Sequence, residues 1–179
     1  MDLPNFTNPE TNINELGIYE GMTIVDLGAG TGAYTIALAK RVGDTGKVYA
    51  VEVQKEFLAN IQDAAKREGL KNIEVIWGDI ERALGTKIKD GLADAVVISN
   101  VLFLAEDKAG LLGEARRILK TGGKLLLVDW KDSFNNLGPV KDAVVPASIA
   151  RGMCERAGFV LKHEFDAGEH HYGFVMLKS

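Results

Sequence analysis

The sequence predicts an α/β fold, and three observations carry that prediction. Apolar runs of strand length alternate with segments of helical periodicity. The strand-like runs are apolar almost throughout, as strands buried on both faces of a parallel sheet must be. Two more strand-like runs near the end of the chain lie so close together that only an antiparallel hairpin can join them. We therefore expect a doubly wound, seven-stranded sheet, mostly parallel, that ends in a C-terminal antiparallel hairpin.

Each element is expected from its own pattern, in chain order. Strands are predicted at residues 23–27, 47–53, 73–77, 93–99 and 124–130. Helices are predicted at 33–41, 55–67, 108–119 and about 147–157. Asp107 is a suitable cap for the helix that begins at residue 108, and Gly122 and Gly123 are suited to end it. The hairpin strands are expected at 159–166 and 171–178.

Length and charge narrow the class of protein. The 179 residues, 46% of them hydrophobic, favour one domain over residues 1–179. The net charge is −4, from 21 basic and 25 acidic residues that are scattered along the chain. Because a nucleic-acid backbone selects for clustered Lys and Arg, no extended nucleic-acid binding is expected. The basic pair Arg116-Arg117 is expected to lie on a solvated helix face.

The single cysteine, Cys154, excludes a disulfide within this sequence and a cysteine metal cluster. Apolar neighbours at helical spacing predict that it is a buried structural thiol. No stretch reaches the roughly 18 apolar residues that a membrane span needs, and the first residues lack the apolar core of a secretory signal. We therefore expect no membrane span and a cytoplasmic location.

A glycine-rich turn follows the first expected strand. Asp26 and Leu27 lead into Gly28, Ala29, Gly30, Thr31 and Gly32, and a helical pattern begins directly afterwards. Glycine lets the backbone turn sharply and lets a ligand approach without a Cβ in the way. In an open parallel sheet, ligands bind outside the carboxyl ends of the strands. The turn therefore predicts a nucleotide site that includes Asp26, Gly28, Ala29, Gly30 and Gly32.

Acidic residues after the next two strands extend this site. Glu52, with Val53 beside it, ends the second expected strand, where a carboxylate accepts hydrogen bonds from two ribose hydroxyls. Asp79 follows the third strand, where it can accept from an adenine amine while Ile80 packs on the ring. Asp79 is equally typical of a turn cap.

The glycine spacing alone fits two cofactors, a nicotinamide dinucleotide and S-adenosyl-L-methionine. A pyrophosphate favours a helix N-terminus aimed at it. S-adenosyl-L-methionine instead carries a carboxylate, an ammonium and a sulfonium, and Asp26 is a better neighbour for this net-cationic ligand. Ser99 and Asn100, at the end of the fourth expected strand, are placed beside the reactive end of the ligand.

With these residues identified, the sequence resembles class I S-adenosylmethionine-dependent methyltransferases from about residue 14 to residue 178. VDLGAGTG resembles the first motif of that family, VEV contains its ribose-binding acid, and GDI contains its adenine-binding acid. DAVVISNVL and ILKTGGKLLLVDW resemble its fourth and fifth strands, and the hairpin resembles its last two. The resemblance implies a Rossmann-like fold, S-adenosyl-L-methionine as cofactor, S-adenosyl-L-homocysteine as product and methyl transfer by in-line displacement.

The chain most resembles the small-molecule group that includes quinone-biosynthesis and arsenite methyltransferases, which implies a small-molecule methyl acceptor. SNVLF lacks the N-P-P-Y or D-P-P-Y pattern of enzymes that methylate base or glutamine amide nitrogens. Cys154 alone cannot replace the several cysteines that hold the metalloid in arsenite enzymes.

The acceptor is expected near the carboxyl ends of the fifth and sixth strands and the hairpin tip. Candidates for its pocket are Trp130, Asp132, His170 and Tyr172. His171 is a candidate catalytic residue because histidine is the natural base near neutral pH. Asn100 is a second candidate because it is placed beside the reactive end of the ligand. At a hairpin tip, His170 is more typical of a solvated residue, and His171 equally fits a structural histidine. No metal site is expected, because the histidine pair lacks third and fourth ligands.

Two segments could close over the acceptor as an apolar lid, through Phe6 near the start and Phe134 and Leu137 after the fifth strand. Ordinary loop packing explains these residues equally well. Two other functions stay open at this point. One is a partner subunit that binds the cofactor without catalysis. The other is an NAD-dependent oxidoreductase, for which the sequence lacks a Tyr-x-x-x-Lys pair after the fourth or fifth strand.

Overall fold

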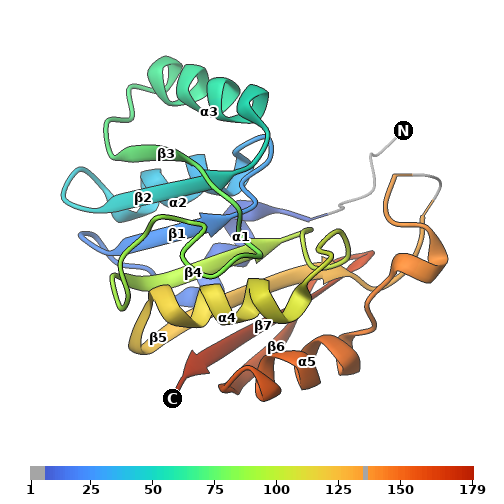
Figure 1. Ribbon diagram of the computed structural model, residues 1–179. Coiled ribbons are helices and arrows are strands. Elements are labelled where there is room, and N and C mark those ends of the chain that lie inside the picture. Colours follow the sequence, from blue (N-terminus) through green and yellow to red (C-terminus); the bar gives the residue numbers. More distant parts are fainter. Residues whose placement is uncertain (1–6, 135–136) are drawn as a thin grey trace.

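The computed structural model describes residues 7–134 and 137–179, and these form one seven-stranded sheet with helices on both faces (Figure 1). The strand order is β3-β2-β1-β4-β5-β7-β6. β1 to β5 all run parallel to one another, and β7 is antiparallel to both β5 and β6. The predicted fold class is confirmed. The strands are β1 (Thr23–Leu27), β2 (Lys47–Glu52), β3 (Ile73–Trp77), β4 (Ala93–Ser99), β5 (Leu119–Trp130), β6 (Phe159–Gly168) and β7 (His171–Lys178).

The helices divide between the two faces of the sheet. Figure 1 shows α4 and α5 in front of the sheet and α1 and α2 behind it. The four long helices begin and end within one residue of their predicted bounds, because their apolar periodicity is clear. They are α2 (Ala33–Val42), α3 (Lys55–Arg67), α4 (Lys108–Ile118) and α5 (Ala147–Arg156). The short helices α1 (Pro9–Asn12), η1 (Ile13–Leu16) and η2 (Lys141–Ala143) were not predicted, since three or four residues show no period.

The apolar residues of the central strands alternate between two cores, as the pleat of a strand requires. In β1, Val25 and Leu27 join the core under α4 and α5, whereas Ile24 joins the core under α2 and η1. β4 and β5 divide their side chains in the same way. Burial on both faces explains why these strands are apolar throughout.

Strand β5 begins five residues earlier than predicted, and this corrects the role assigned to Gly122 and Gly123. The helix α4 already ends at Ile118, because Leu119 is extended (φ −72°, ψ 141°) and pairs with Ala93 of β4. Gly122, with φ 74°, lies inside β5, where the register against β4 shifts between Ala93 and Ala95. The glycines therefore accommodate an irregularity in a strand and do not end the helix.

The prediction of a solvated face at Arg116-Arg117 is wrong for Arg117. Its guanidinium donates to Glu114 Oε2 and Oε1 (2.8 and 2.7 Å) and to the carbonyl of Ile88 (2.8 Å), and it pairs with Asp90. The signal missed was Glu114, a buried acid three residues before the arginine on the same helix. Cys154 is buried as predicted, and burial raises the pKa of its thiol to about 12.

The topology places the carboxyl ends of β1 and β4 side by side where the strand order reverses. This is the position at which open α/β sheets bind ligands. β6 runs in the direction of β5, since both are antiparallel to β7, so its end lies at the same edge. Within residues 7–134 and 137–179, no helix is long and apolar enough to cross a membrane.

Candidate functional site

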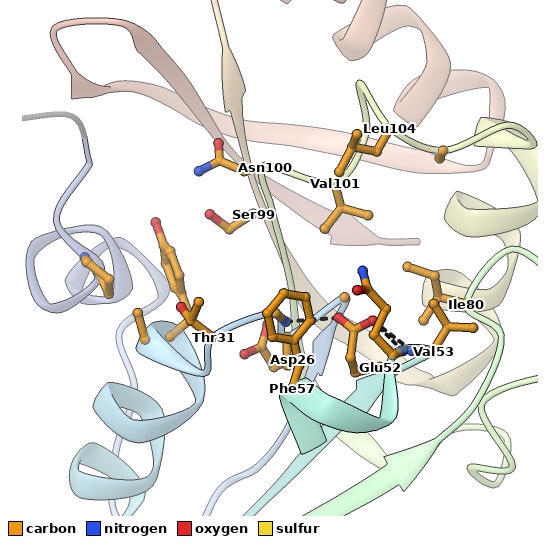
Figure 2. Close-up of a pocket in the computed structure, with 18 of the residues that line it drawn as sticks. Asp26, Thr31, Glu52, Val53, Phe57, Ile80, Ser99, Asn100, Val101 and Leu104 are labelled. Atoms are coloured by element: carbon orange, nitrogen blue, oxygen red, sulfur yellow. Dashed lines mark hydrogen bonds between the residues drawn. The ribbon is translucent and has the colours of Figure 1, made fainter. Parts of the chain in front are cut away.

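A cavity of about 640 Å³ opens at the carboxyl ends of β1, β2 and β4. Its size is typical of a small-molecule site. Segments far apart in the sequence contribute to it: Thr7 and Pro9, the glycine turn after β1, the end of β2, the residues after β3, and residues 99–101 with 104–105 after β4. Figure 2 shows Ile80 and Val53 on one side of the cavity, Glu52 near its middle and Thr31 on the other side.

The glycine turn has the tight geometry that its sequence predicts. Gly28, Gly30 and Gly32 all have positive φ angles, of 73°, 50° and 85°. A Cβ on Gly28 would lie 2.6 Å from Val101 Cγ2, and one on Gly32 would lie 2.6 Å from Ile61 Cγ1. At Gly30 the nearest atom would be 3.9 Å away, so this backbone faces open space in the cavity. Only glycine satisfies both the conformation and the close packing here.

Glu52 is buried and fixes the glycine turn to the end of β2. Its Oε2 accepts from the backbone N–H of Gly30 (3.0 Å), and its Oε1 accepts from Val53 (2.8 Å) and Gln54 (3.0 Å), as the dashed lines in Figure 2 show in part. A carboxylate oxygen accepts two hydrogen bonds, so Oε2 retains capacity for a ligand hydroxyl. The predicted ribose-binding acid is thus at the cavity and already oriented.

Asp26 lines the cavity and is almost fully buried. Its Oδ2 accepts a 2.6 Å hydrogen bond from the Thr35 hydroxyl in the first turn of α2. Burial raises the pKa of Asp26 to about 6, the Glu52 charge adds to this, and the Thr35 hydrogen bonds oppose it. Asp26 therefore ties α2 to β1, a role that the sequence did not reveal, while its charge still faces the cavity.

Asp79 and Ile80 both line the cavity on the β3 side. Asp79 Oδ1 accepts from the backbone N–H of Glu81 (3.0 Å), which is the turn-capping arrangement that the sequence left open. Capping uses only part of the accepting capacity of a carboxylate, so it is compatible with a contact to a ligand amine.

Two polar atoms at the end of β4 are buried without a hydrogen-bond partner among the described residues: Ser99 Oγ and Asn100 Oδ1. Both residues line the cavity. Asn100 is also held at φ 57°, with its N–H bonded to the Val128 carbonyl (2.9 Å). Because a buried polar atom without a partner costs free energy, such atoms at a cavity point to a ligand that supplies the missing bonds.

The charged side chains among the described lining residues are all acidic. Asp26, Glu52, Asp79 and Glu81 contribute carboxylates. Among the described residues around the cavity, none is a Lys, Arg or His. Such a lining favours cationic and neutral ligands and disfavours a ligand with a pyrophosphate.

Of the residues predicted for the acceptor, Asn100 lines the cavity, whereas Trp130, His171 and Tyr172 lie where β5 ends and β7 begins and are not among its described lining residues. Trp130 pairs with His171 across the two strands, and their rings lie 4.2 Å apart. Tyr172 is buried and donates to the Val145 carbonyl (3.0 Å), and burial raises the pKa of its phenol. A contact of these residues with the acceptor therefore stays a prediction.

His170 is not the solvated residue that its place at a hairpin tip suggested. It is buried, its Nδ1 lies 2.8 Å from Asp132 Oδ1, and its ring stacks on Phe134 with 4.1 Å between ring centres. Phe134 is thereby packed against the hairpin, and Leu137 is 63% exposed. Of the predicted lid, Phe6 lies outside the described residues.

Sequence reasoning missed about half of the residues that line the cavity, and Thr7, Pro9 and Tyr34 are among them. Thr7 and Pro9 belong to a segment with no periodicity, so no pattern predicted where it would lie. Tyr34 is the second residue of α2, and its position directly after the glycine turn was the available signal.

The fold and the cavity define a class: an α/β protein that binds a nucleoside-type cofactor at the switch point of a parallel sheet. Residues 18–162 match the sequence model of a family described as "Methyltransferase domain", and the chain belongs to this family. The predicted resemblance to class I S-adenosylmethionine-dependent methyltransferases is confirmed.

Individual relatives agree with this assignment. An arsenite methyltransferase of Aquipseudomonas alcaligenes is 35% identical over 116 residues, which cover 63% of this chain and 34% of that protein. The ubiquinone/menaquinone biosynthesis C-methyltransferase UbiE of Escherichia coli is 35% identical over 118 residues, covering 64% of this chain and 45% of its own. The chain thus spans less than half the length of these relatives.

A solved structure matches over nearly the whole chain. It is a SAM-dependent methyltransferase from Aquifex aeolicus, with a TM-score of 0.88 and 28% sequence identity. The match covers 99% of this chain and 95% of that one.

Proposed function

We propose that this protein transfers a methyl group from S-adenosyl-L-methionine to a small-molecule acceptor. The observation that carries the proposal is the acidic cavity beside the glycine turn, with Glu52 at its centre and no basic side chain among its described lining residues. A dinucleotide would bring a pyrophosphate against four carboxylates, whereas S-adenosyl-L-methionine brings a net positive charge. Family membership and the Aquifex aeolicus structure support the same cofactor.

Different residues of the cavity would bind different parts of this ligand. Asp79 and Ile80 would hold the adenine, Glu52 the ribose, and the turn at Gly28 to Gly32 the amino-acid end. When bound, the cofactor supplies a methyl group on a sulfonium, which is an activated leaving group. In the transfer, the nucleophile of the acceptor would form a bond to the methyl carbon while the C–S bond breaks with its electrons going to sulfur, so that S-adenosyl-L-homocysteine leaves.

The task left to the protein is to position the acceptor, and positioning of this kind lowers a barrier by several kcal/mol, about 7 in favourable cases. Ser99 Oγ and Asn100 Oδ1 are the groups that would bind the acceptor, because they are buried at the cavity without partners among the described residues. Asn100 Oδ1 accepts hydrogen bonds but is not a base, so it would orient an N–H or O–H group of the acceptor. A role of His171 as base stays a prediction, since the cavity lining does not include it.

Two features narrow the acceptor that we propose. The acidic lining disfavours anionic acceptors. Arsenite chemistry would need several accessible thiols, and Cys154 is a single, buried thiol with a raised pKa. We therefore propose an organic acceptor that is neutral or cationic. A cytoplasmic location and the absence of extended nucleic-acid binding remain predictions of the sequence.

Calorimetric titration of the pure protein with S-adenosyl-L-homocysteine, S-adenosyl-L-methionine and NADH tests the proposal. We expect binding of the first two and none of NADH; binding of NADH alone would overturn it. Transfer of a labelled methyl group into a pool of small metabolites then separates an enzyme from a partner subunit that only binds the cofactor. Binding without transfer to any neutral or amine acceptor would favour the partner subunit.

A further inference from the structure

The wall of the cavity on the α2 side is built by a polar network that the proposed roles above do not use. Its centre is Asn12, which is only 2% exposed. Asn12 Nδ2 donates to Thr7 Oγ1 (2.7 Å) and to the Tyr34 hydroxyl oxygen (2.8 Å), and it lies 3.5 Å from the Ala167 carbonyl oxygen of β6. Thr7 and Tyr34 both line the cavity. The network thus fixes two hydroxyl groups at the cavity wall.

The hydrogens of this network can be counted. The Ala167 carbonyl only accepts, which supports placing the amide nitrogen of Asn12, and not its oxygen, on this side. The Asn12 amide has two hydrogens for three oxygens, so the hydroxyl oxygens of Thr7 and Tyr34, at 2.7 and 2.8 Å, are its main acceptors and the 3.5 Å contact with the Ala167 carbonyl is the weakest of the three. The two hydroxyls lie 3.3 Å apart, so one of their own hydrogens is shared between them. The other hydroxyl hydrogen is left for a group in the cavity.

The proposed cofactor contains a group that needs such a donor. Its amino-acid carboxylate enters a cavity lined by four carboxylates, and no described lining residue is a cation that could neutralise it. Hydroxyl and amide donors are the alternative. Tyr34 stands in the first turn of α2, a ten-residue helix, where the N-terminal partial charge also favours an anion. The adenosine-binding residues lie toward the other end: Figure 2 shows Ile80 and Thr31 on opposite sides of Glu52.

We propose that Thr7 and Tyr34, held by Asn12, form a hydroxyl clamp for the carboxylate at the amino-acid end of S-adenosyl-L-methionine. This inference rests on the proposed function. The clamp makes the segment at residues 7–12 part of the cofactor site, although that segment lies before the matched family region at 18–162. It also explains how an acidic cavity can take a zwitterionic ligand: the carboxylate is bound by hydroxyl donors that Asn12 holds in place at the wall on the α2 side.

The test compares two ligands that differ only at the amino-acid end. S-adenosyl-L-homocysteine carries the carboxylate, whereas 5′-methylthioadenosine has the same nucleoside and thioether without it. Calorimetry gives both affinities for the native protein, Tyr34→Phe, Thr7→Val and the double variant. In the double variant we expect affinity for S-adenosyl-L-homocysteine to fall about tenfold or more, the loss typical of a hydrogen bond to a charged group, with 5′-methylthioadenosine unaffected. Each single variant should lose less, because the other hydroxyl can still donate.

Tyr49→Phe is the matched control, since Tyr49 of β2 is partly buried but does not line the cavity. It should change neither affinity. The proposal is overturned if the double variant keeps its affinity for S-adenosyl-L-homocysteine, or if both ligands weaken equally, which would indicate a structural role alone. If the double variant does not fold, as judged by its thermal transition, the same comparison with Thr7→Val decides. Failure of the native protein to bind S-adenosyl-L-homocysteine would instead overturn the proposed function.

Discussion

Buried carboxylates occur in two regions of this protein, and their surroundings are opposite. On α4, Glu114 accepts from Arg117, from the Thr86 hydroxyl (2.6 Å) and from the backbone N–H groups of Leu84 (3.1 Å) and Thr86 (3.3 Å). We call Glu114, Arg117, Thr86 and Asp90 the α4 cluster. At the carboxyl edge of the sheet, the side chain of Asp26 accepts from one described residue, Thr35, and polar atoms of Ser99 and Asn100 are left without partners in the described chain.

The pKa values follow this difference. Burial alone would raise the pKa of Glu114, but the donors around it lower it to about 2. At the edge, burial dominates and raises the pKa of both Asp26 and Asp129 to about 6. Asp129, at the end of β5, accepts from the N–H groups of Trp130 (2.8 Å) and Phe103 (3.3 Å) and so holds the loop after β4 that lines the cavity. In the α4 cluster the polar groups bond to one another and stabilise the fold, whereas at the carboxyl edge some polar atoms can still bind a ligand.

Disruption of the α4 cluster should change the free energy of unfolding more than any other substitution predicted below. Arg117→Met leaves the Glu114 carboxylate buried without its ion pair, and we expect the free energy of unfolding to fall by about 3 to 5 kcal/mol. Urea denaturation measures this. Arg116→Met is the adjacent control: among the described residues, the Arg116 guanidinium makes two 3.4 Å contacts with carbonyl oxygens, so the loss should stay below about 1 kcal/mol. Equal losses for the two variants would contradict the distinction between the neighbours.

At the carboxyl edge, Glu52→Ala should weaken the binding of S-adenosyl-L-homocysteine. It removes the acceptor proposed for the ribose hydroxyls and releases the N–H of Gly30. We expect affinity for S-adenosyl-L-homocysteine to weaken by about 1 to 3 kcal/mol through the lost charged hydrogen bonds. Calorimetry measures this affinity, and Glu74→Ala serves as the control, because Glu74 is an exposed acid of β3 that pairs with Lys47. Unchanged affinity for Glu52→Ala would show that this acid does not hold the ribose.

The two kinds of carboxylate should separate in the pH dependence of stability. Asp26 and Asp129 have native pKa values of about 6 against 3.8 ordinarily, so the native state binds more protons between these values. The free energy of unfolding should therefore rise as pH falls from 7 to 5, by about 1 kcal/mol for each group. Glu114, lowered from 4.5 to about 2, acts in the opposite sense, and its contribution is lost as pH falls below about 4.5.

Urea midpoints at pH 7, 5 and 3 test both signs. Asp26→Asn should remove part of the gain between pH 7 and 5 and leave the loss below pH 4.5 in place. A native protein that already loses stability between pH 7 and 5 would contradict the raised pKa values at the edge.

The same contrast shows what a sequence can predict. The strands, the long helices and the glycine turn follow from local patterns, and so did the places of Glu52 and Asp79 at strand ends. The α4 cluster was missed because Glu114 and Thr86 meet only through the fold, 28 residues apart. Tyr34 and Thr7 were missed for the same reason, at a separation of 27 residues. His170 was placed wrongly because its burial depends on Asp132 and Phe134 from another loop.

Substitution of Asn100 should change the free energy of unfolding least. Asn100 sits at φ 57°, which glycine adopts without strain, and its Oδ1 is buried without a partner among the described residues. Asn100→Gly therefore removes no hydrogen bond of Oδ1 from the free protein, and we expect stability to stay within about 1 kcal/mol of the native value or to rise slightly. Asn100→Ala loses the same amide but places a Cβ at positive φ, so it should be less stable than the glycine variant by about 1 kcal/mol. Thermal denaturation compares the two. A loss above about 2 kcal/mol for Asn100→Gly would mean that the amide already stabilises the fold, as Glu114 does, and is not held in reserve for an acceptor.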